Sequence, residues 1–178
     1  MRDTTIARNY AETLLELAKR GGDMRGWGEL IKALSDAMGS NPKLRLFLES
    51  PRVSAAEKNA VLGKAFTAGT PRNFLRFLQS LVSHRRQMLI PHIAVEYMDL
   101  LDDVEGRMHA RVTVASESSA EETAAIAKQL SRMFGKDVIP HVNVDPAIMG
   151  GVMIHVGDTV LDGSVRKRLA SLRRKMMA

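Results

Sequence analysis

The stretch that most constrains the fold is residues 144–172, VDPAIMGGVMIHVGDTVLDGSVRKRLASL, where turn, strand and helix signals follow one another closely. Asp145-Pro146 predicts a turn, and apolar residues at every second position of 152–156 predict a strand with one apolar face. Gly157-Asp158 predicts a second turn, and residues 159–161 predict a second short strand. This part of the chain therefore combines a small sheet with a following helix.

The helix that follows these strands is strongly basic. The turn Asp162-Gly163-Ser164 offers Asp162 or Ser164 as its N-cap. Val165, Leu169 and Leu172 share one helical face, and six basic residues occupy the rest: Arg166, Lys167, Arg168, Arg173, Arg174 and Lys175. The stretch holds no nucleophile, metal-ligand set or phosphate-binding loop, so we expect no catalytic site in it.

The chain up to Glu105 is predicted to be helical, because glycine and proline signals divide it into about six amphipathic segments. These helices are expected at about residues 4–20, 25–38, 42–48, 55–66, 71–83 and 90–104. Ser54 and Glu57 form a capping box, while Thr70 is the expected cap of the fifth helix, with Pro71 as its first residue. Short links between the helices favour a bundle.

The hydrophobic period changes at Gly106. Residues 108–114 alternate between apolar and polar, which predicts a half-buried strand. Ser118 or Ser119 caps a predicted helix ending at Phe134-Gly135, and residues 138–144 form a second strand that Pro140 makes edge-like. The helices are expected to pack on one face of the sheet.

The predicted fold is therefore an α plus α/β chain of two domains. Residues 1–105 form a six-helix bundle, and residues 106–178 form a small α+β domain with a short mixed sheet and two helices. The sequence has no signal-peptide core and no apolar run of membrane-spanning length, so we expect a soluble chain.

Motifs for catalysis or metal binding are weak. The five histidines form no HxxxH or HExxH pair and no cysteine assists them. His109, His141 and His155 are therefore expected to be solvated or second-layer residues on the outward side of their strands. The acidic residues Asp99, Asp102, Asp103 and Glu105 are expected to form a solvated domain junction, with contact to a basic partner as the alternative for some of them. Gly150-Gly151 predicts a bulge or a close backbone approach. We expect no enzyme activity, no metal and no cofactor.

The positive charge is local. The formal net charge is +6, and residues 166–175 carry six basic side chains and no acidic one. The remaining 20 Lys and Arg residues balance the 20 Asp and Glu residues. A nucleic-acid-binding module using the basic last helix is the alternative function, although few aromatic residues and a neutral remainder disfavour it.

Several motifs resemble the delta subunit of F-type ATP synthase and its mitochondrial relative, the oligomycin-sensitivity-conferring protein. The most specific are Ile148-Met149-Gly150-Gly151-Val152 and the run from Gly157 to Arg166, followed by a leucine-spaced helix. Weaker matches precede them in the family's order: Ala7-Arg8-Asn9-Tyr10-Ala11 with Leu14, Asn41-Pro42, Ser50-Pro51, and Phe77-Leu78 through His84-Arg85-Arg86 to Pro91. The resemblance covers nearly the whole chain.

The resemblance implies a non-catalytic stator subunit of a proton-translocating ATP synthase. The helical domain is expected to hold N-terminal helices of the alpha subunits, and the C-terminal domain the end of the b-type peripheral stalk. The implied location is the cytoplasmic face of a bacterial plasma membrane, reached only through the complex. No cofactor and no nucleic acid are implied as partners.

Candidate partner-binding residues follow from helical wheels together with this resemblance. The apolar arc of the first helix is wider than a small bundle needs. One edge carries Ala11, Leu15 and Ala18 for the core, and the other carries Ile6, Tyr10, Thr13 and Leu17. Phe77 and Ser80 of the fifth helix are expected to complete the alpha-subunit groove, unless Tyr10 is simply a core residue. Arg173, Arg174 and Lys175 are expected to face the stalk, unless they form a solvated face.

Overall fold

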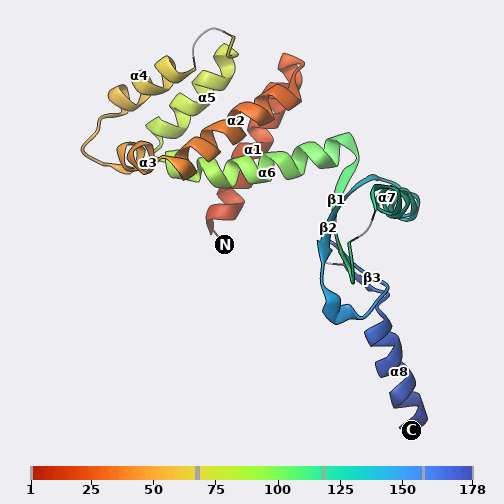
Figure 1. The fold of residues 1–178 in the computed structure, drawn as a ribbon. Helices are drawn as coiled ribbons and strands as arrows, with labels where there is room; N and C mark the ends of the chain where they lie inside the picture. The colour runs from red at the N-terminus through yellow and green to blue at the C-terminus, as the bar shows by residue number, and fades with distance from the viewer. Residues whose placement is uncertain (1, 67–68, 118, 158, 178) are drawn as a thin grey trace. The chain divides into compact units, whose positions relative to one another are not determined.

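The computed structural model describes residues 2–66, 69–117, 119–157 and 159–177. The chain divides into two compact units, Met1–Asp102 and Asp103–Ala178, and each is described by itself. Figure 1 labels their helices and strands. No helix of the described residues is long and apolar enough to cross a membrane.

The first unit consists of helices joined by short links. They are α1 (Arg2–Gly21), α2 (Met24–Ser40), α3 (Pro42–Glu49), α4 (Ala55–Ala65), α5 (Arg72–Ser83), the 3-10 turn η1 (Gln87–Leu89) and α6 (Ile90–Glu105), whose last turn enters the second unit. The predicted capping box is confirmed: the Glu57 amide donates to the Ser54 hydroxyl, and the Glu57 carboxylate accepts from the Ser54 amide. These hydrogen bonds hold the pKa of Glu57 below its ordinary value.

The predicted start of α5 was wrong by one residue. Pro71, not Thr70, occupies the N-cap position, and no side chain caps the helix. The carbonyl of Pro71 accepts from the amides of Phe74 and Leu75, so the first helical residue is Arg72. Proline has no amide hydrogen to lose and its fixed φ suits a helix entrance, which lets it serve at either position.

The core of the first unit comes mostly from aliphatic residues and alanines. Trp27, Ile31, Leu34 and Met38 are buried as their spacing predicts, and Leu30 packs partly buried beside them. Ala11 and Ala18 of α1 are fully buried, and their small size allows neighbouring helices to approach closely.

A buried lysine closes the end of α3. The Lys58 ammonium donates to the carbonyls of Leu48 (2.6 Å) and Ser50 (2.9 Å), and the Gln87 side-chain amide also donates to Leu48 (2.8 Å). The last carbonyls of a helix have no partner within it, so these donors satisfy groups that would otherwise be buried without one.

The second unit is a four-stranded mixed sheet with helices. Its elements are β1 (Arg107–Val114), α7 (Ala120–Phe134), β2 (Asp137–Val144), the 3-10 turn η2 (Pro146–Ile148), β3 (Val152–Val156), β4 (Thr159–Asp162) and α8 (Val165–Met177). The strand order is β2-β1-β3-β4, with β1 and β2 parallel and the other pairs antiparallel. The predicted α+β combination is confirmed, and β2 with Pro140 lies at an edge as expected.

Helix α7 covers the inner face of this sheet. Its N-cap is Ser119, which forms a capping box with Glu122, whereas Ser118 lies outside the described residues. The core joins Leu130 of α7 to Ala110, Val112, Val138 and Ile154 of three strands. Helix α7 ends at Phe134, and the next residue, Gly135, stops it with a left-handed φ of 66°.

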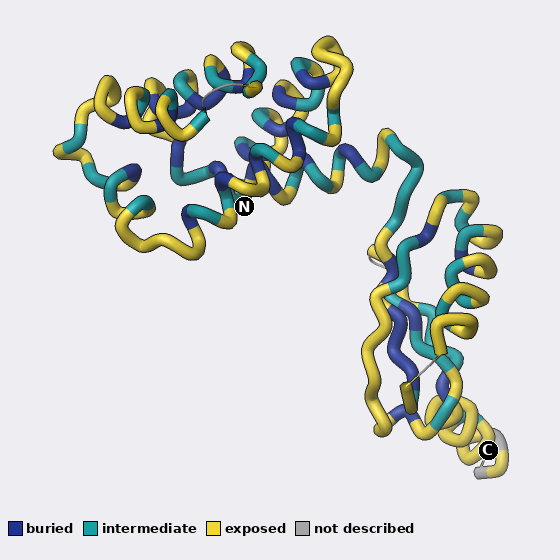
Figure 2. The backbone as a smooth tube through the Cα atoms, turned by 45° about the horizontal axis from the view of Figure 1, so that its top comes forward, coloured by how far each residue is buried: buried dark blue, intermediate teal, exposed yellow. Residues whose placement is uncertain are grey.

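The expectation that both helices pack on the sheet was wrong for α8. Val165, Leu169 and Leu172 are 37%, 53% and 56% exposed, so the apolar face of α8 does not join the core. Figure 2 shows the exposed course of this helix. The core of this sheet is built from α7 and the strands, and no described residue of α8 belongs to it.

The backbone at Gly150-Gly151 closely approaches another backbone segment, as predicted. A Cβ on Gly151 would lie 2.4 Å from the carbonyl oxygen of Gly163, and Gly151 has a φ of 78°. The chain here is tied to the start of α8 by the Val165 amide, which donates to the Gly150 carbonyl (2.9 Å). Both candidate caps contribute: the Ser164 hydroxyl accepts from the Lys167 amide and the Asp162 carboxylate from the Ser164 amide. Asp158, in the predicted second turn, lies outside the described residues.

Candidate partner-binding surfaces

The two helices predicted to form a groove are neighbours in the first unit. The ring of Tyr10 on α1 lies edge-on to Phe77 of α5, with centroids 6.2 Å apart. Arg86, in the link between α5 and η1, donates from Nη1 to the Tyr10 hydroxyl (3.0 Å), and its Cζ lies 5.5 Å from the centroid of that ring. Tyr10 therefore joins an aromatic contact on one side to a cation on the other.

The predicted residues of α1 lie along the edge of its buried stripe. Ala7, Ala11, Leu14 and Ala18 are fully buried, whereas Ile6, Tyr10 and Leu17 are half-buried and Thr13 is exposed. The Thr13 hydroxyl donates to the carbonyl of Asn9 (2.9 Å). Tyr10 and Leu17 also pack against the core, so Tyr10 has both a core contact and an accessible part.

On α5, Phe77 is buried and Ser80 is exposed. His84, just after the helix, donates from Nδ1 to the Ser80 carbonyl (2.8 Å), and the Ser80 hydroxyl lies 3.5 Å from the same nitrogen. The structure thus brings Tyr10 and Phe77 together and leaves Ser80 on the outer side of the helix. Arg86 was missed from the sequence, because no local pattern links it to a residue 76 positions earlier.

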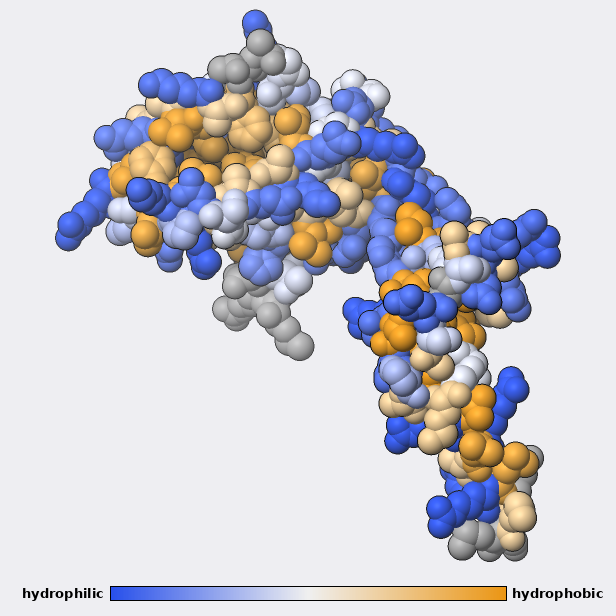
Figure 3. All heavy atoms as spheres, in the orientation of Figure 1, coloured by the Kyte–Doolittle hydropathy of each residue, from blue (hydrophilic) through white to orange (hydrophobic). Residues whose placement is uncertain are grey.

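The second candidate surface is α8. Arg173 and Arg174 are exposed, and the side chain of Lys175 lies outside the described ones. Beside these basic residues, Val165, Leu169, Leu172 and Met176 follow a helical spacing and are all exposed. Figure 3 shows hydrophobic and hydrophilic side chains next to each other on this helix. An exposed apolar stripe of this kind marks an interaction surface.

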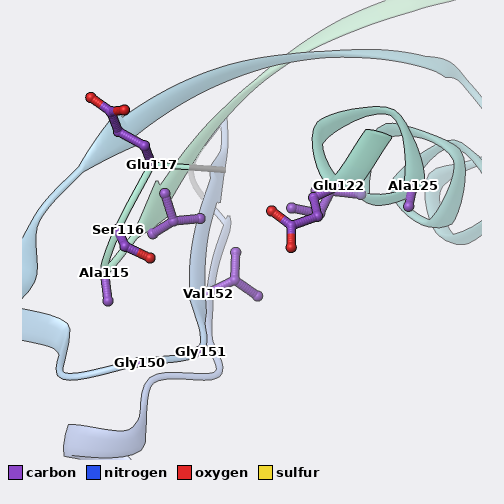
Figure 4. A pocket seen from close by; sticks show the side chains of 10 residues that line it. Ala115, Ser116, Glu117, Glu122, Ala125, Gly150, Gly151 and Val152 are labelled. Carbon is purple, nitrogen blue, oxygen red and sulfur yellow. The ribbon is translucent and has the colours of Figure 1, made fainter. Parts of the chain in front are cut away.

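A hollow of about 430 Å³ lies at the end of β1, between the start of α7 and the Gly150-Gly151 segment. Figure 4 shows Glu122 directed toward it and Glu117 directed away. The Glu122 carboxylate accepts from the Ser119 amide (2.9 Å) and so serves the helix cap. Among the described residues that line this hollow, the ionisable ones are the two carboxylates Glu117 and Glu122.

The acidic residues near the unit boundary are partly paired. The Lys136 ammonium lies 3.0 Å from the Asp103 carboxylate, and Arg107 pairs with Glu105. Both pairs lie within the second unit. The expected solvated cluster is therefore in part a set of local ion pairs.

Comparison with known proteins decides the family. The family model described as ATP synthase delta (OSCP) subunit matches residues 6–176. The chain belongs to the ATP synthase delta (OSCP) subunit family. An ATP synthase subunit delta of Gemmatimonas aurantiaca is 54% identical over 97% of this chain and 93% of its own. One from Desulforamulus reducens is 34% identical over 97% and 96% of the two chains.

A solved structure shares the fold. A chain in the cryo-EM structure of the Toxoplasma gondii mitochondrial ATP synthase hexamer superposes with a TM-score of 0.67 at 19% identity, and covers 97% of both chains. As a member of the delta family, this chain is a structural, non-catalytic stator subunit of an ATP synthase, and its partners are other subunits of that complex. The nucleic-acid-binding alternative has no support from these comparisons.

Proposed function

We propose that this delta-family subunit links the N-terminal helices of the alpha subunits to the C-terminal end of the b-type stalk. Helices α1–α6 act as one bundle that binds the alpha subunits, and residues 106–178 bind the stalk. The complex lies at the cytoplasmic face of a bacterial plasma membrane. The observation that carries the proposal is that each unit has its own accessible apolar side chains, at the α1/α5 edge in the first unit and on the exposed face of α8 in the second.

The edge formed by α1 and α5 suits an incoming amphipathic helix. Tyr10 presents an aromatic ring that Phe77 and Arg86 hold from two sides. A ring held in this way loses little conformational entropy on binding, and aromatic anchors dominate the energy of such interfaces. Ile6 and Leu17 extend an apolar row to either side of it along α1.

Helix α8 suits a different partner, because apolar and basic side chains lie next to each other on it. Its apolar stripe can pack against a helix of the stalk while Arg173, Arg174 and Lys175 meet acidic side chains there. A stator link must stay bound while the rotor turns, so a slow dissociation rate matters more than any chemical step. Burial of the apolar stripe supplies the slow dissociation, and complementary charges set the orientation of the stalk helix on α8.

The alpha-subunit side is tested by calorimetric titration of the full chain with a synthetic alpha N-terminal peptide. Tyr10→Ala is expected to weaken binding by about 1–3 kcal/mol, as for an interface anchor. Val95→Ala, at an exposed position of α6 in the same unit, is the matched control and should bind as the unchanged protein does. A Tyr10→Ala protein that melts normally and binds with full affinity refutes the α1/α5 groove.

The stalk side is tested separately with the soluble part of a b-type subunit. Leu169→Ser with Leu172→Ser, and Arg173, Arg174 and Lys175 changed to Glu, should each weaken this binding and leave alpha-peptide binding unchanged. Lys128→Glu with Arg132→Glu on α7 alters charge on another exposed helix of the same unit and serves as the control. Stalk affinity that survives both α8 variants contradicts this assignment.

The division at Gly106 has its own test. A fragment of residues 1–105 should fold cooperatively and bind the alpha peptide, because its core contains only residues of the first unit. Thermal melts followed by circular dichroism measure the cooperativity. A broad, non-cooperative melt would count against an independent helical domain.

A further inference from the structure

The outer face of the sheet, opposite α7, gathers the three histidines of the strands around one arginine. In the strand register, Arg111 of β1 is the partner of His141 on β2 and of His155 on β3. The row His141–Arg111–His155 therefore crosses three adjacent strands. Side chains opposite one another in a sheet are close neighbours, so the three basic groups share one site on this face.

His109 completes this group. Its Nδ1 lies 2.8 Å from Nε2 of His141, and the two ring centroids are 4.9 Å apart. One ring must donate and the other accept, so this contact uses a single proton between two imidazoles. A shallow hollow of about 440 Å³ is lined by His109, Arg111, His141, His155 and Gly157.

The described charged groups around this hollow can be named individually. By strand alternation, the outer face also carries Arg107 of β1, Asp137 of β2 and Asp162 of β4. Arg107 pairs with Glu105, and the Asp162 carboxylate accepts from the Ser164 amide (3.0 Å). Among the described residues that line the hollow, none is acidic, and no described carboxylate pairs with Arg111.

We propose that this face carries a proton-dependent binding site for a tetrahedral oxyanion, a phosphate or phosphate monoester, centred on Arg111 and completed by His109, His141 and His155. A guanidinium presents a planar fork of donors that matches two oxygens of a phosphate group. Imidazoles gain charge and a second donor below neutral pH. An anion between them offsets the repulsion that would follow when both members of the His109–His141 pair are protonated.

A metal ion fits this site less well. The guanidinium in the middle of the row repels a cation, and no group of three or more metal-ligating side chains was found among the described residues. The same arrangement attracts a doubly charged anion. The residues of this site are different from those that we propose for the partner subunits on α8, α1 and α5.

The test is a titration of the full chain with sodium sulfate and with sodium phosphate at constant ionic strength. Backbone amide chemical shifts in NMR spectra monitor the binding. Sulfate keeps its charge between about pH 6 and pH 8, so a change in its affinity over this range reports protonation of the protein and not of the anion. We expect binding to tighten at least about tenfold from pH 8 to pH 6, with shifts centred on β1, β2 and β3. Methyl phosphate distinguishes the two ligands named in the proposal, free phosphate and a phosphate monoester. An affinity equal to that of phosphate indicates that the site accepts a monoester, and a much lower affinity indicates that it binds free phosphate.

Variants locate the site. Arg111→Gln should weaken sulfate binding at pH 6 by about tenfold or more, and His141→Gln with His155→Gln should remove most of the pH dependence. Arg132→Gln, an exposed arginine on α7, is the matched control and should bind as the unchanged protein does. Sulfate affinity that does not change with pH, shifts confined to α8, or full binding by a folded Arg111→Gln protein would each overturn the proposal.

Discussion

The guanidinium of Arg86 donates to the hydroxyl of Tyr10 (3.0 Å) and lies over the same ring, 5.5 Å from its centroid. The contact ties the segment after α5 back to α1, across 76 positions of sequence. It therefore fixes the orientation of the ring that we propose as the anchor for the alpha subunit.

A double-mutant cycle on these two residues should show coupling. Tyr10→Phe removes the acceptor but keeps the ring, and Arg86→Met removes the donor and the cation. We expect a coupling free energy of unfolding of about 0.5–1.5 kcal/mol, the range of one net hydrogen bond, because the cation–π contact persists in Tyr10→Phe and cancels in the cycle. Urea unfolding of the four proteins measures it, and strictly additive effects would show that the contact does not stabilise the fold.

Lys58→Met should destabilise the first unit by about 1–3 kcal/mol, because the Ser50 carbonyl loses a donor and Leu48 keeps only Gln87. Methionine has a similar length, so packing changes little. Lys64→Met, at an exposed position of the same helix, is the control. Equal denaturation midpoints for the two variants would show that the buried ammonium contributes nothing net.

Gly151→Ala should destabilise the second unit by more than Gly157→Ala. Both glycines have positive φ, but only at Gly151 would the new Cβ meet a backbone oxygen, that of Gly163 at 2.4 Å. Gly157→Ala isolates the backbone strain, about 1 kcal/mol, and the steric conflict adds at least about 1 kcal/mol at Gly151. Chemical denaturation of both variants provides the comparison, and equal losses would contradict the close approach.

The first unit should lose stability at alkaline pH through Tyr97. Burial, with a further contribution from Asp23, raises the pKa of this phenol, whose hydroxyl donates to the Met24 carbonyl (2.7 Å). A folded pKa above the unfolded one means that the neutral phenol's contribution is complete below about pH 10 and declines as pH rises above it. Tyr97→Phe should flatten that decline. Parallel pH profiles for the variant and the unchanged protein would exclude Tyr97 as its source.

Much of the fold could be predicted from local signals. The capping box at Ser54, a cap at Ser118 or Ser119, the glycines at Gly21 and Gly135, and the alternation of residues 108–114 predicted the element types and their bounds to within a few residues. The position of α8 could not be predicted in this way. The sequence pattern of an apolar stripe is the same whether the helix packs on its own sheet or binds another chain. The apolar stripe of α8 is exposed.

The candidate sites, too, were predictable from the sequence only in part. The helical wheel separated Ala11 and Ala18 from Tyr10, because periodicity reports which side of a helix is buried. Neither Arg86 nor the grouping of His109, His141 and His155 could be found from spacing. These contacts depend on strand register and on how distant segments meet, which only the tertiary structure provides.

The central place of β1 in the sheet determines when the second unit can form. β1 is the first strand to leave the ribosome, but it pairs with β2 and β3, so it has no partner until α7 and then the segment beyond Gly151 have followed. Its crossover through α7 also makes the parallel pair non-local, which slows folding, whereas the helices of the first unit form from nearby contacts. The surface that we propose for the alpha subunits is therefore complete in the nascent chain before the surface that we propose for the stalk has formed.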